Sequence, residues 1–341
     1  MNIDLLAELC EAPGPPGREE AVREIVLREL RPLADAVTVD PLGNVIARRA
    51  GEGPAVAIVA HMDEIGFMVT HVEEEGFIRV IPLGGFDPKT LTAQRVVVHG
   101  REDLLGVMGA TAVHLLTPEE RKRAPRLEDY FVDVGLAAQR VRELVRPGDV
   151  VTRERRLARL GDLVTCKSLD NRAGVYALIE ALRALGDHRA EIVAIASVQE
   201  EVGARGARVA TSRVRPAVGL AVDTTLANDT PGAKPHERVT ALGGGAAIKV
   251  YDTSAIVPAR LVDHLVALAE ARGIRHQLEV MPRGGTDTRE LQLAGEGALA
   301  GCVSIPMRYA HQVVECCHPD DLDAAVALVG AFCETAHELV P

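Results

Sequence analysis

The segment 55–66, which reads AVAIVAHMDEIG, restricts the possible folds of this chain more than any other. Its first six residues, 55–60, are small or β-branched and apolar, without a polar interruption. Such a run predicts a strand that is buried on both faces of a parallel sheet. The run ends at His61, Asp63 and Glu64, and ligands in open α/β sheets collect at the carboxyl ends of strands. We therefore expect an α/β fold that presents polar groups at one edge of its sheet.

His61 and Asp63 are two residues apart, so in extended chain their side chains lie on the same face. This arrangement suits a metal-bound imidazole whose second ring nitrogen is held by a nearby carboxylate. The ordinary alternative is a histidine at a strand end that forms only local hydrogen bonds. The motif by itself leaves both interpretations open.

Composition narrows the class of protein further. The chain has 341 residues, of which 47% are hydrophobic but only 3% aromatic, and it lacks Trp. A core built from Ala, Val, Leu and Ile fits close packing of helices on a sheet. The formal net charge of −11 argues against nucleic acid or an anionic membrane as a partner.

The cysteines and the N-terminus predict a soluble protein of the cytoplasm. Six cysteines occur without CxxC pairs, which is typical of reduced thiols in a chain of this length. The first residues, MNIDLLAELCEAPG, lack the basic and apolar segments of a signal peptide. No apolar run approaches the roughly 20 residues needed to span a bilayer.

The predicted elements divide the chain into a catalytic domain and an insert. Alternating helices and buried strands in 1–66 and 163–341 predict a mixed-sheet α/β domain. Between them, 67–162 contains short strands separated by Gly, Pro or charged clusters and one helical segment, 137–145, which predicts a β-rich module. The five strands expected in the insert are Phe67–Thr70, Phe77–Ile81, Arg95–Val98, Leu104–Met108 and Tyr130–Val134.

Several further strand ends carry metal-ligand residue types. Since these strand exits would meet at one edge of the sheet, the mixture of imidazole and carboxylate suits two divalent cations, zinc or cobalt. A two-metal site needs about five protein ligands, including a carboxylate that bridges the ions. Five residues at the expected strand ends meet this need: His61, Asp170, Glu201, Asp223 and His311.

The pair Glu200 and Glu201 offers one carboxylate more than metal binding requires. Hydrolysis also needs a base that takes a proton from the attacking water. Neighbouring side chains on an extended segment point apart, so one glutamate can bind metal while the other faces the substrate.

Six motifs, in chain order, resemble those of the TET (tetrahedral) aminopeptidases, di-metal peptidases of the MH clan that include glutamyl aminopeptidases and endoglucanase-like proteins. The resemblance covers nearly the whole chain, insert included. The motifs are AHMDEIGF, KSLDNRAG, QEEVGARGA, AVDTT with DTPG, GGTDT and RYAHQVVE.

The resemblance implies a role for each candidate residue. Asp170 would bridge two metal ions, Glu200 would be the general base, and Asp63 would orient His61. The insert would drive assembly into a hollow homo-dodecamer that admits peptide substrates. The implied metal ligands are His61, Asp170, Glu201, Asp223 and His311.

The chain departs from the family pattern at two motifs. Gln312 follows the last ligand histidine, where the family usually has Ser. Thr288 and Arg289 follow Asp287, where the family often has Ala. We expect both departures to lie near the substrate pocket.

The sequence as a whole predicts a metallo-aminopeptidase that hydrolyses the N-terminal peptide bond with a metal-bridging water and a glutamate base. Two alternatives remain: a metal-dependent amidohydrolase or dipeptidase acting on a small acylated substrate, and a metal-binding assembly protein without turnover. Other hydrolase motifs fail, because HERVT (236–240) and HELVP (337–341) lack the second histidine of HExxH, and no GxSxG motif occurs.

Overall fold

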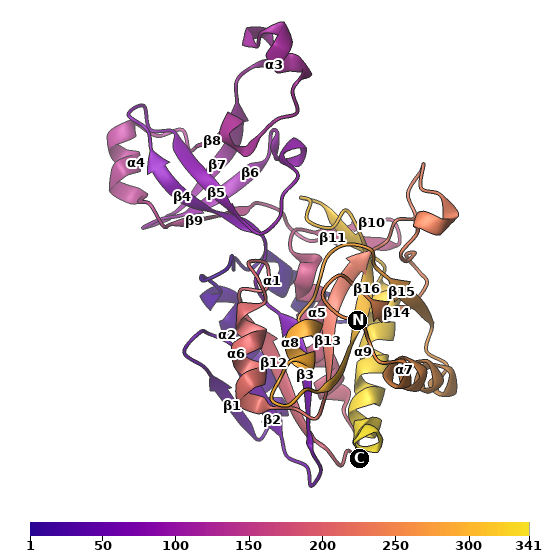
Figure 1. Ribbon diagram of the computed structural model, residues 1–341. Coiled ribbons are helices and arrows are strands. Elements are labelled where there is room, and N and C mark those ends of the chain that lie inside the picture. Colours follow the sequence, from indigo (N-terminus) through magenta and orange to yellow (C-terminus); the bar gives the residue numbers. More distant parts are fainter. Residues whose placement is uncertain (341) are drawn as a thin grey trace.

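The computed structural model describes residues 1–340. Their strands form two separate sheets, a large mixed sheet of eleven strands and a closed barrel. Figure 1 shows the barrel standing apart from the larger domain, with both chain termini in that larger domain. The structure therefore confirms an α/β fold with a mixed sheet and a separate β-rich module.

The large sheet has the strand order β1-β2-β12-β3-β13-β16-β17-β11-β10, and β14 and β15 extend from β16. Its centre is parallel, because β3 pairs with both β12 and β13 in parallel and β13 pairs likewise with β16. The strands are β1 (Ala36–Val39), β2 (Val45–Arg49), β3 (Ala55–His61), β10 (Ala158–Leu160), β11 (Leu163–Cys166), β12 (Glu191–Ser197), β13 (Val218–Leu226), β14 (Ala246–Tyr251), β15 (His276–Val280), β16 (Leu299–Arg308) and β17 (Glu315–Cys317).

Helices cover both faces of this sheet, which explains the uninterrupted apolar runs of its central strands. One face packs against α1 (Ile3–Glu11), α2 (Glu20–Leu30), α5 (Leu169–Ala184), α7 (Ala259–Arg272) and α9 (Pro319–Thr335). The other face packs against α6 (Arg205–Val214) and α8 (Thr288–Gln292). In β3 the side chains alternate between these two cores, so Ile58 belongs to the first and Val59 to the second.

The insert is a barrel with the strand order β4-β5-β8-β7-β6-β9. Its core is closed by α4 (Ala138–Leu144), which buries Val141 and Leu144 against the strands. A short helix, α3 (Pro118–Lys122), lies at the outer end of the barrel (Figure 1). The strands are β4 (Gly66–Val72), β5 (Ile78–Leu83), β6 (Arg95–His99), β7 (Asp103–Ala110), β8 (Tyr130–Asp133) and β9 (Val150–Arg153).

Two strands in this region differ from the expectation. The structure adds β9, a strand that the sequence did not predict and that closes the barrel between β6 and β4. It also places β10 in the large sheet, paired with β11, although the segment lies inside the expected insert 67–162. Strand pairing therefore favours a boundary between Arg153 and Ala158. Among the helices formed by residues 1–340, none has both the length and the apolar character needed to cross a membrane.

Candidate metal centre and active site

Five strands that run in the same direction deliver the candidate residues to one edge of the large sheet. Four of them, β12, β3, β13 and β16, are parallel neighbours. The fifth, β11, has the same direction because it is antiparallel to β17, which is antiparallel to β16. The carboxyl ends of strands with a common direction lie at the same edge, so residues distant in the sequence converge there.

The first group of possible ligands consists of His61, Asp170 and Asp223. The Nε2 atom of His61 lies 3.4 Å from Asp170 Oδ1 and 3.7 Å from Asp223 Oδ1. Asp223 lies within β13, which continues to Leu226, whereas the sequence analysis expected Asp223 at the end of its strand. The strand continues because Thr224 and the following residues still pair with β16.

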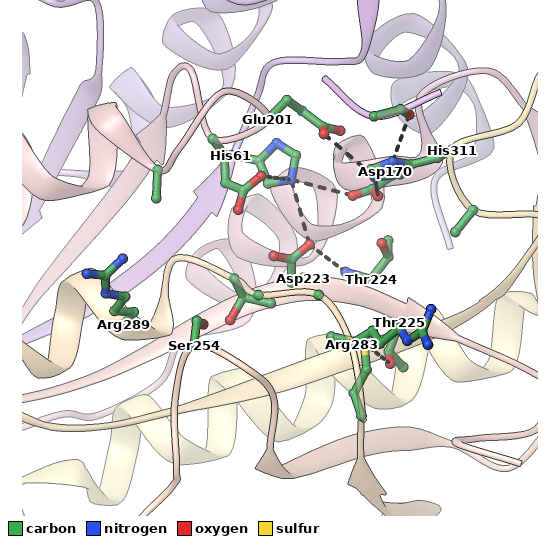
Figure 2. Close-up of a pocket in the computed structure, with 18 of the residues that line it drawn as sticks. His61, Asp170, Glu201, Asp223, Thr224, Thr225, Ser254, Arg283, Arg289 and His311 are labelled. Carbon is green, nitrogen blue, oxygen red and sulfur yellow. Dashed lines mark hydrogen bonds and ion pairs between the residues drawn. The ribbon is translucent and has the colours of Figure 1, made fainter. Parts of the chain in front are cut away.

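The second group consists of Asp170, Glu201 and His311. His311 Nε2 lies 3.3 Å from Asp170 Oδ2 and 3.6 Å from Glu201 Oε2. Figure 2 shows Asp170 between His61 and His311. The two oxygens of a single carboxylate thus face one histidine each, which is the arrangement expected of a carboxylate shared by two ions.

Glu200 and Asp63 stand beside these groups. Glu200 lines the cavity with 17% of its side chain exposed, whereas Glu201 is only 4% exposed. Asp63 is fully buried and accepts hydrogen bonds from the backbone N–H groups of Glu200 (3.0 Å) and Glu201 (3.1 Å). It also lies 3.4 Å from His61 Nδ1, a nitrogen without a hydrogen bond to residues 1–340. Asp63 therefore fixes the glutamate pair as well as facing the imidazole.

Burial and mutual repulsion shape the ionisation of the carboxyl groups. Burial, together with repulsion from the neighbouring Asp170, raises the pKa of Glu201 and of Asp223 to about 8 each. Burial also raises the pKa of Glu200 well above its ordinary value. Asp170 differs: burial opposes its ionisation, but hydrogen bonds from His311 and His61 hold its pKa well below the usual range.

These observations fit a site built for cations. Several carboxylates crowded in a buried space repel each other, and a divalent cation would relieve that repulsion. In addition, Glu201 Oε1 is buried and has no hydrogen-bond partner among residues 1–340. Imidazole and carboxylate donors together suit zinc and similar first-row ions.

The candidate residues border a cavity of about 520 Å³. Its remaining wall includes residues that the sequence did not single out, among them Gly85, Ser254, Met281 and Arg283. Figure 2 shows Ser254 and Arg283 on the side of the cavity away from His311. Ser254 and Arg283 follow β14 and β15, which run against β16, so the rule of common strand ends could not find them.

The two departures from the family motifs have different positions. Arg289 lines the cavity, as expected. Thr288 is fully buried next to it, with its hydroxyl bonded to Thr286, and does not line the cavity. Gln312 does not line it either, and its backbone carbonyl accepts a hydrogen bond from Arg153.

The fold and the site together are those of a zinc-exopeptidase-like hydrolase. Residues 43–328 match the family described as M42 glutamyl aminopeptidase, and the chain belongs to that family. The lysyl aminopeptidase of Pyrococcus furiosus is 36% identical over 98% of this chain and 97% of its own length.

Solved structures give the same relationship. The aminopeptidase APDkam598 of the archaeon Desulfurococcus kamchatkensis superposes with a TM-score of 0.94 and 38% identity, covering 97% of this chain and 94% of its own. PhTET1-12s, described as a dodecamer in the asymmetric unit, superposes with a TM-score of 0.87 and 33% identity, covering 98% and 99% of the two chains.

These comparisons confirm the resemblance to the TET aminopeptidases that the six motifs indicated. The chain is an aminopeptidase, a hydrolase that acts on peptide bonds, and it contains two groups of residues able to hold metal ions. Family membership favours this activity over an amidohydrolase of small acylated substrates and over a protein without turnover.

Proposed function

We propose that this chain is a two-metal aminopeptidase, with zinc or cobalt as its ions. One ion would be held by His61 and Asp223, the other by Glu201 and His311, and Asp170 would contribute to both. When bound, the ions would polarise the attacking water and the substrate carbonyl and stabilise negative charge on the carbonyl oxygen. The observation that carries the proposal is the division of the two Asp170 oxygens between His61 and His311.

Glu200 is the proposed general base. It is the more exposed member of the glutamate pair, and its Oε2 lies 3.9 Å from His61 Nε2. It would accept the proton of the attacking water and return it to the leaving amine. Asp63 would position Glu200 without contacting the substrate. Its two carboxylate oxygens accept hydrogen bonds from the backbone N–H groups of Glu200 and Glu201, and its Oδ1 also faces His61.

Paired substitutions separate chemistry from metal retention. Glu200→Gln should keep two ions per subunit and lose several orders of magnitude in kcat, because a general base contributes roughly 10²–10⁴-fold. Glu201→Gln should lose metal instead. Glu237→Gln, at an exposed residue, is the matched control. Metal analysis of each dialysed variant accompanies the kinetics, and a Glu200→Gln enzyme with a near-normal rate would refute the assignment.

A second measurement tests the aminopeptidase reaction against deacylation. Peptides with a free N-terminus should be cleaved at their first bond, and N-acetylated versions of the same peptides should resist. Equal rates on both sets would instead favour the amidohydrolase alternative.

We also propose a homo-oligomer, a dodecamer, that takes up peptides in the cytoplasm. The dodecamer of PhTET1-12s supports the assembly, as do apolar side chains on the outside of the barrel such as Leu105 and Leu115, which are 59% and 77% exposed. The six free, buried cysteines support a reducing compartment. Light scattering tests the assembly, and an active monomer at micromolar concentration would contradict it.

A further inference from the structure

The inserted barrel contacts the metal centre through the loop that follows β5 and leads to β6. The carbonyl oxygen of Gly85 lies 3.0 Å from His311 Nδ1. A carbonyl can only accept a hydrogen bond, so Nδ1 carries the proton and donates. In the neutral imidazole, Nε2 is then the unprotonated nitrogen, and it faces Asp170 and Glu201. A backbone group of the insert thus prepares His311 to act as a ligand.

A second connection runs through Arg153, the last residue of β9. Its side chain is 1% exposed and lies over the ring of Phe86, 5.7 Å from the ring centre. Its Nη1 donates a hydrogen bond to the carbonyl of Gln312, the residue after His311. Its Nη2 lies 3.9 Å from Glu315 Oε1, beyond hydrogen-bond distance. Arg153 therefore holds the loop that carries His311.

Glu315 extends the connection to the shared carboxylate. It is 1% exposed, and its Oε2 accepts a hydrogen bond of 3.1 Å from the backbone N–H of Asp170. The guanidinium of Arg153 thus faces two groups, one adjacent in sequence to His311 and the other bonded to Asp170. His311 belongs to one proposed half of the metal centre and Asp170 to both halves, whereas His61 and Asp223 lie on strands of the large sheet.

The cost of burying the charged side chain of Arg153 indicates a role other than stabilising the fold. Its Nε and Nη2 are buried and have no hydrogen-bond partner among residues 1–340. A buried charge with incomplete partners is unfavourable, and hydrophobic replacements of buried ion pairs are often neutral or stabilising. Among the described barrel residues, Arg153 is also the one charged side chain classed as buried. Packing of the barrel alone does not account for it.

We infer that Arg153 is a positioning residue for the half-site of Asp170, Glu201 and His311, an inference that rests on the proposed two-metal function. Its contacts with the Gln312 carbonyl and with Glu315 connect the inserted barrel to that half-site, so that the position of the barrel influences the position of the ligands. The half-site of His61 and Asp223 is connected to this link only through Asp170, which both half-sites share. Loss of the guanidinium should therefore weaken the binding of the ion at Glu201 and His311, whereas the ion at His61 and Asp223 should still bind.

The test titrates metal-free protein with Co²⁺, followed by visible absorbance, and measures zinc per subunit after dialysis. Arg153→Met should bind one ion as the wild type does and the second about 10–100-fold more weakly, the usual effect of losing a supporting residue around a metal ligand. Arg153→Lys keeps the charge but loses the planar fork, so it should weaken the second ion too. His311→Gln provides the reference spectrum for the singly loaded form, and Arg156→Met, at an exposed neighbour, provides the control.

The outcomes are distinct. A singly loaded Arg153→Met spectrum that matches His311→Gln supports the inference. Wild-type binding of both ions by Arg153→Met, or wild-type behaviour of Arg153→Lys, would overturn it, as would equal weakening of both ions. If Arg153→Met does not fold, Arg153→Lys decides the question, because it retains the buried charge. A wild-type protein that binds fewer than two ions would instead refute the proposed function itself.

Discussion

The large sheet and the inserted barrel differ in how many charged side chains they bury and where those side chains lie. In the catalytic domain, ionisable side chains are buried at and beneath the active edge of the sheet, for example Glu64, Lys167, Lys249 and Glu279. In the barrel, the buried charged residue is Arg153, and it faces the catalytic domain. Since burying charge is costly unless it is paired, its distribution separates the part of the molecule that performs chemistry from the part that supports it.

The two regions also differ in how apolar residues are distributed along their strands. In β13 eight successive residues are buried, because helices cover both faces of the sheet. In β7 only Gly106 and Met108 are buried, and Leu105 and Val107 point outward and are 59% and 47% exposed. The apolar residues of the barrel therefore exceed what its own core uses. A surface of this kind is suited to a partner, which supports the proposed assembly.

The largest effect on stability should come from the buried charges of the catalytic domain. Glu64 is fully buried and accepts hydrogen bonds from Lys167 Nζ (2.7 Å) and Ser168 Oγ (2.7 Å). Glu64→Gln would leave the buried Lys167 without its counterion and should cost about 3–5 kcal/mol of unfolding free energy. Glu75→Gln, on the exposed surface of the barrel, should change it by less than about 0.5 kcal/mol. Chemical denaturation of both variants measures their unfolding free energies. Equal losses in Glu64→Gln and Glu75→Gln would contradict the proposed difference between the two regions.

The same pair predicts a dependence on pH. Burial opposes ionisation of Glu64, but Lys167 and Arg172 outweigh it and lower the pKa of Glu64. Burial lowers the pKa of Lys167 below its ordinary value, although Glu64 opposes that shift. Of the two partners, it is therefore the carboxylate whose pKa shift stabilises the folded state. A lowered carboxyl pKa stabilises the fold above its unfolded value near 4.3, and this contribution is lost as the pH falls through the folded pKa. The stability difference between the wild type and Glu64→Gln should therefore shrink in acid; a constant difference would contradict the ion pair.

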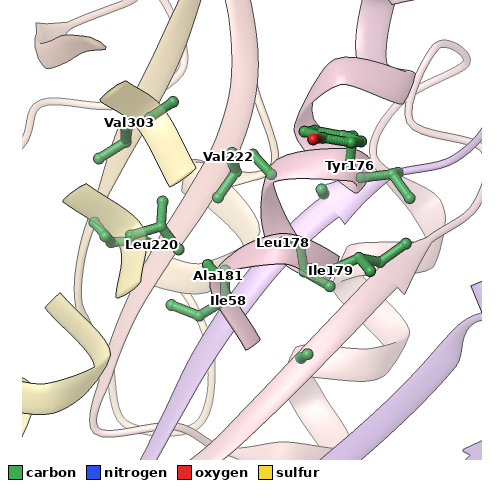
Figure 3. Close-up of a cluster of buried hydrophobic side chains, with 14 of the residues drawn as sticks. Ile58, Tyr176, Leu178, Ile179, Ala181, Leu220, Val222 and Val303 are labelled. Atoms are coloured by element: carbon green, nitrogen blue, oxygen red, sulfur yellow. The ribbon is translucent and has the colours of Figure 1, made fainter. Parts of the chain in front are cut away.

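A smaller effect should distinguish the two hydrophobic cores. Ile58 is 2% exposed and packs with Ala181, Leu220 and Val222 between the sheet and α5 (Figure 3). Ile78 is fully buried inside the barrel. Truncation of a buried Ile to Ala costs about 2–5 kcal/mol, depending on how far the site can collapse. We expect Ile58→Ala near the upper end and Ile78→Ala near the lower end, because the core of the barrel is smaller than that of the large domain. Thermal and urea unfolding would test this order, and its reversal would show the barrel to be the more rigid region.

The smallest effect on stability should accompany a clear effect on assembly. Leu115, near α3, is 77% exposed, so Leu115→Ser should change the unfolding free energy of a subunit by less than about 0.5 kcal/mol. If the outer surface of the barrel binds another subunit, the same substitution should shift light scattering toward smaller particles. Val39→Ser, at an exposed residue of β1 in the large sheet, is the control. Unchanged particle size in Leu115→Ser would remove this residue from the proposed interface.

The order of the elements and the ligand-type residues at the strand ends could be predicted from the sequence alone. The apolar run before His61 predicted β3, and similar runs indicated β12 and the central parts of β13 and β16, because the composition of a strand buried on both faces already indicates it. The structure extends β13 beyond Asp223, where the apolar run stops. The sequence also indicated the candidate residues and the β-rich nature of the insert. Where local signals were weak, as for β9 with its charged neighbours, the prediction failed.

How these residues combine depends on the folded arrangement of the chain. The fold groups His61 with Asp223 and His311 with Glu201, with one oxygen of Asp170 for each histidine. The fold also brings Gly85 and Arg153 from the insert to the loop of His311, although Gly85 and His311 are 226 positions apart in the sequence. Such contacts depend on strand order and on how one domain docks on the other. No local pattern encodes either, because each is set by the packing of segments that are distant in the sequence.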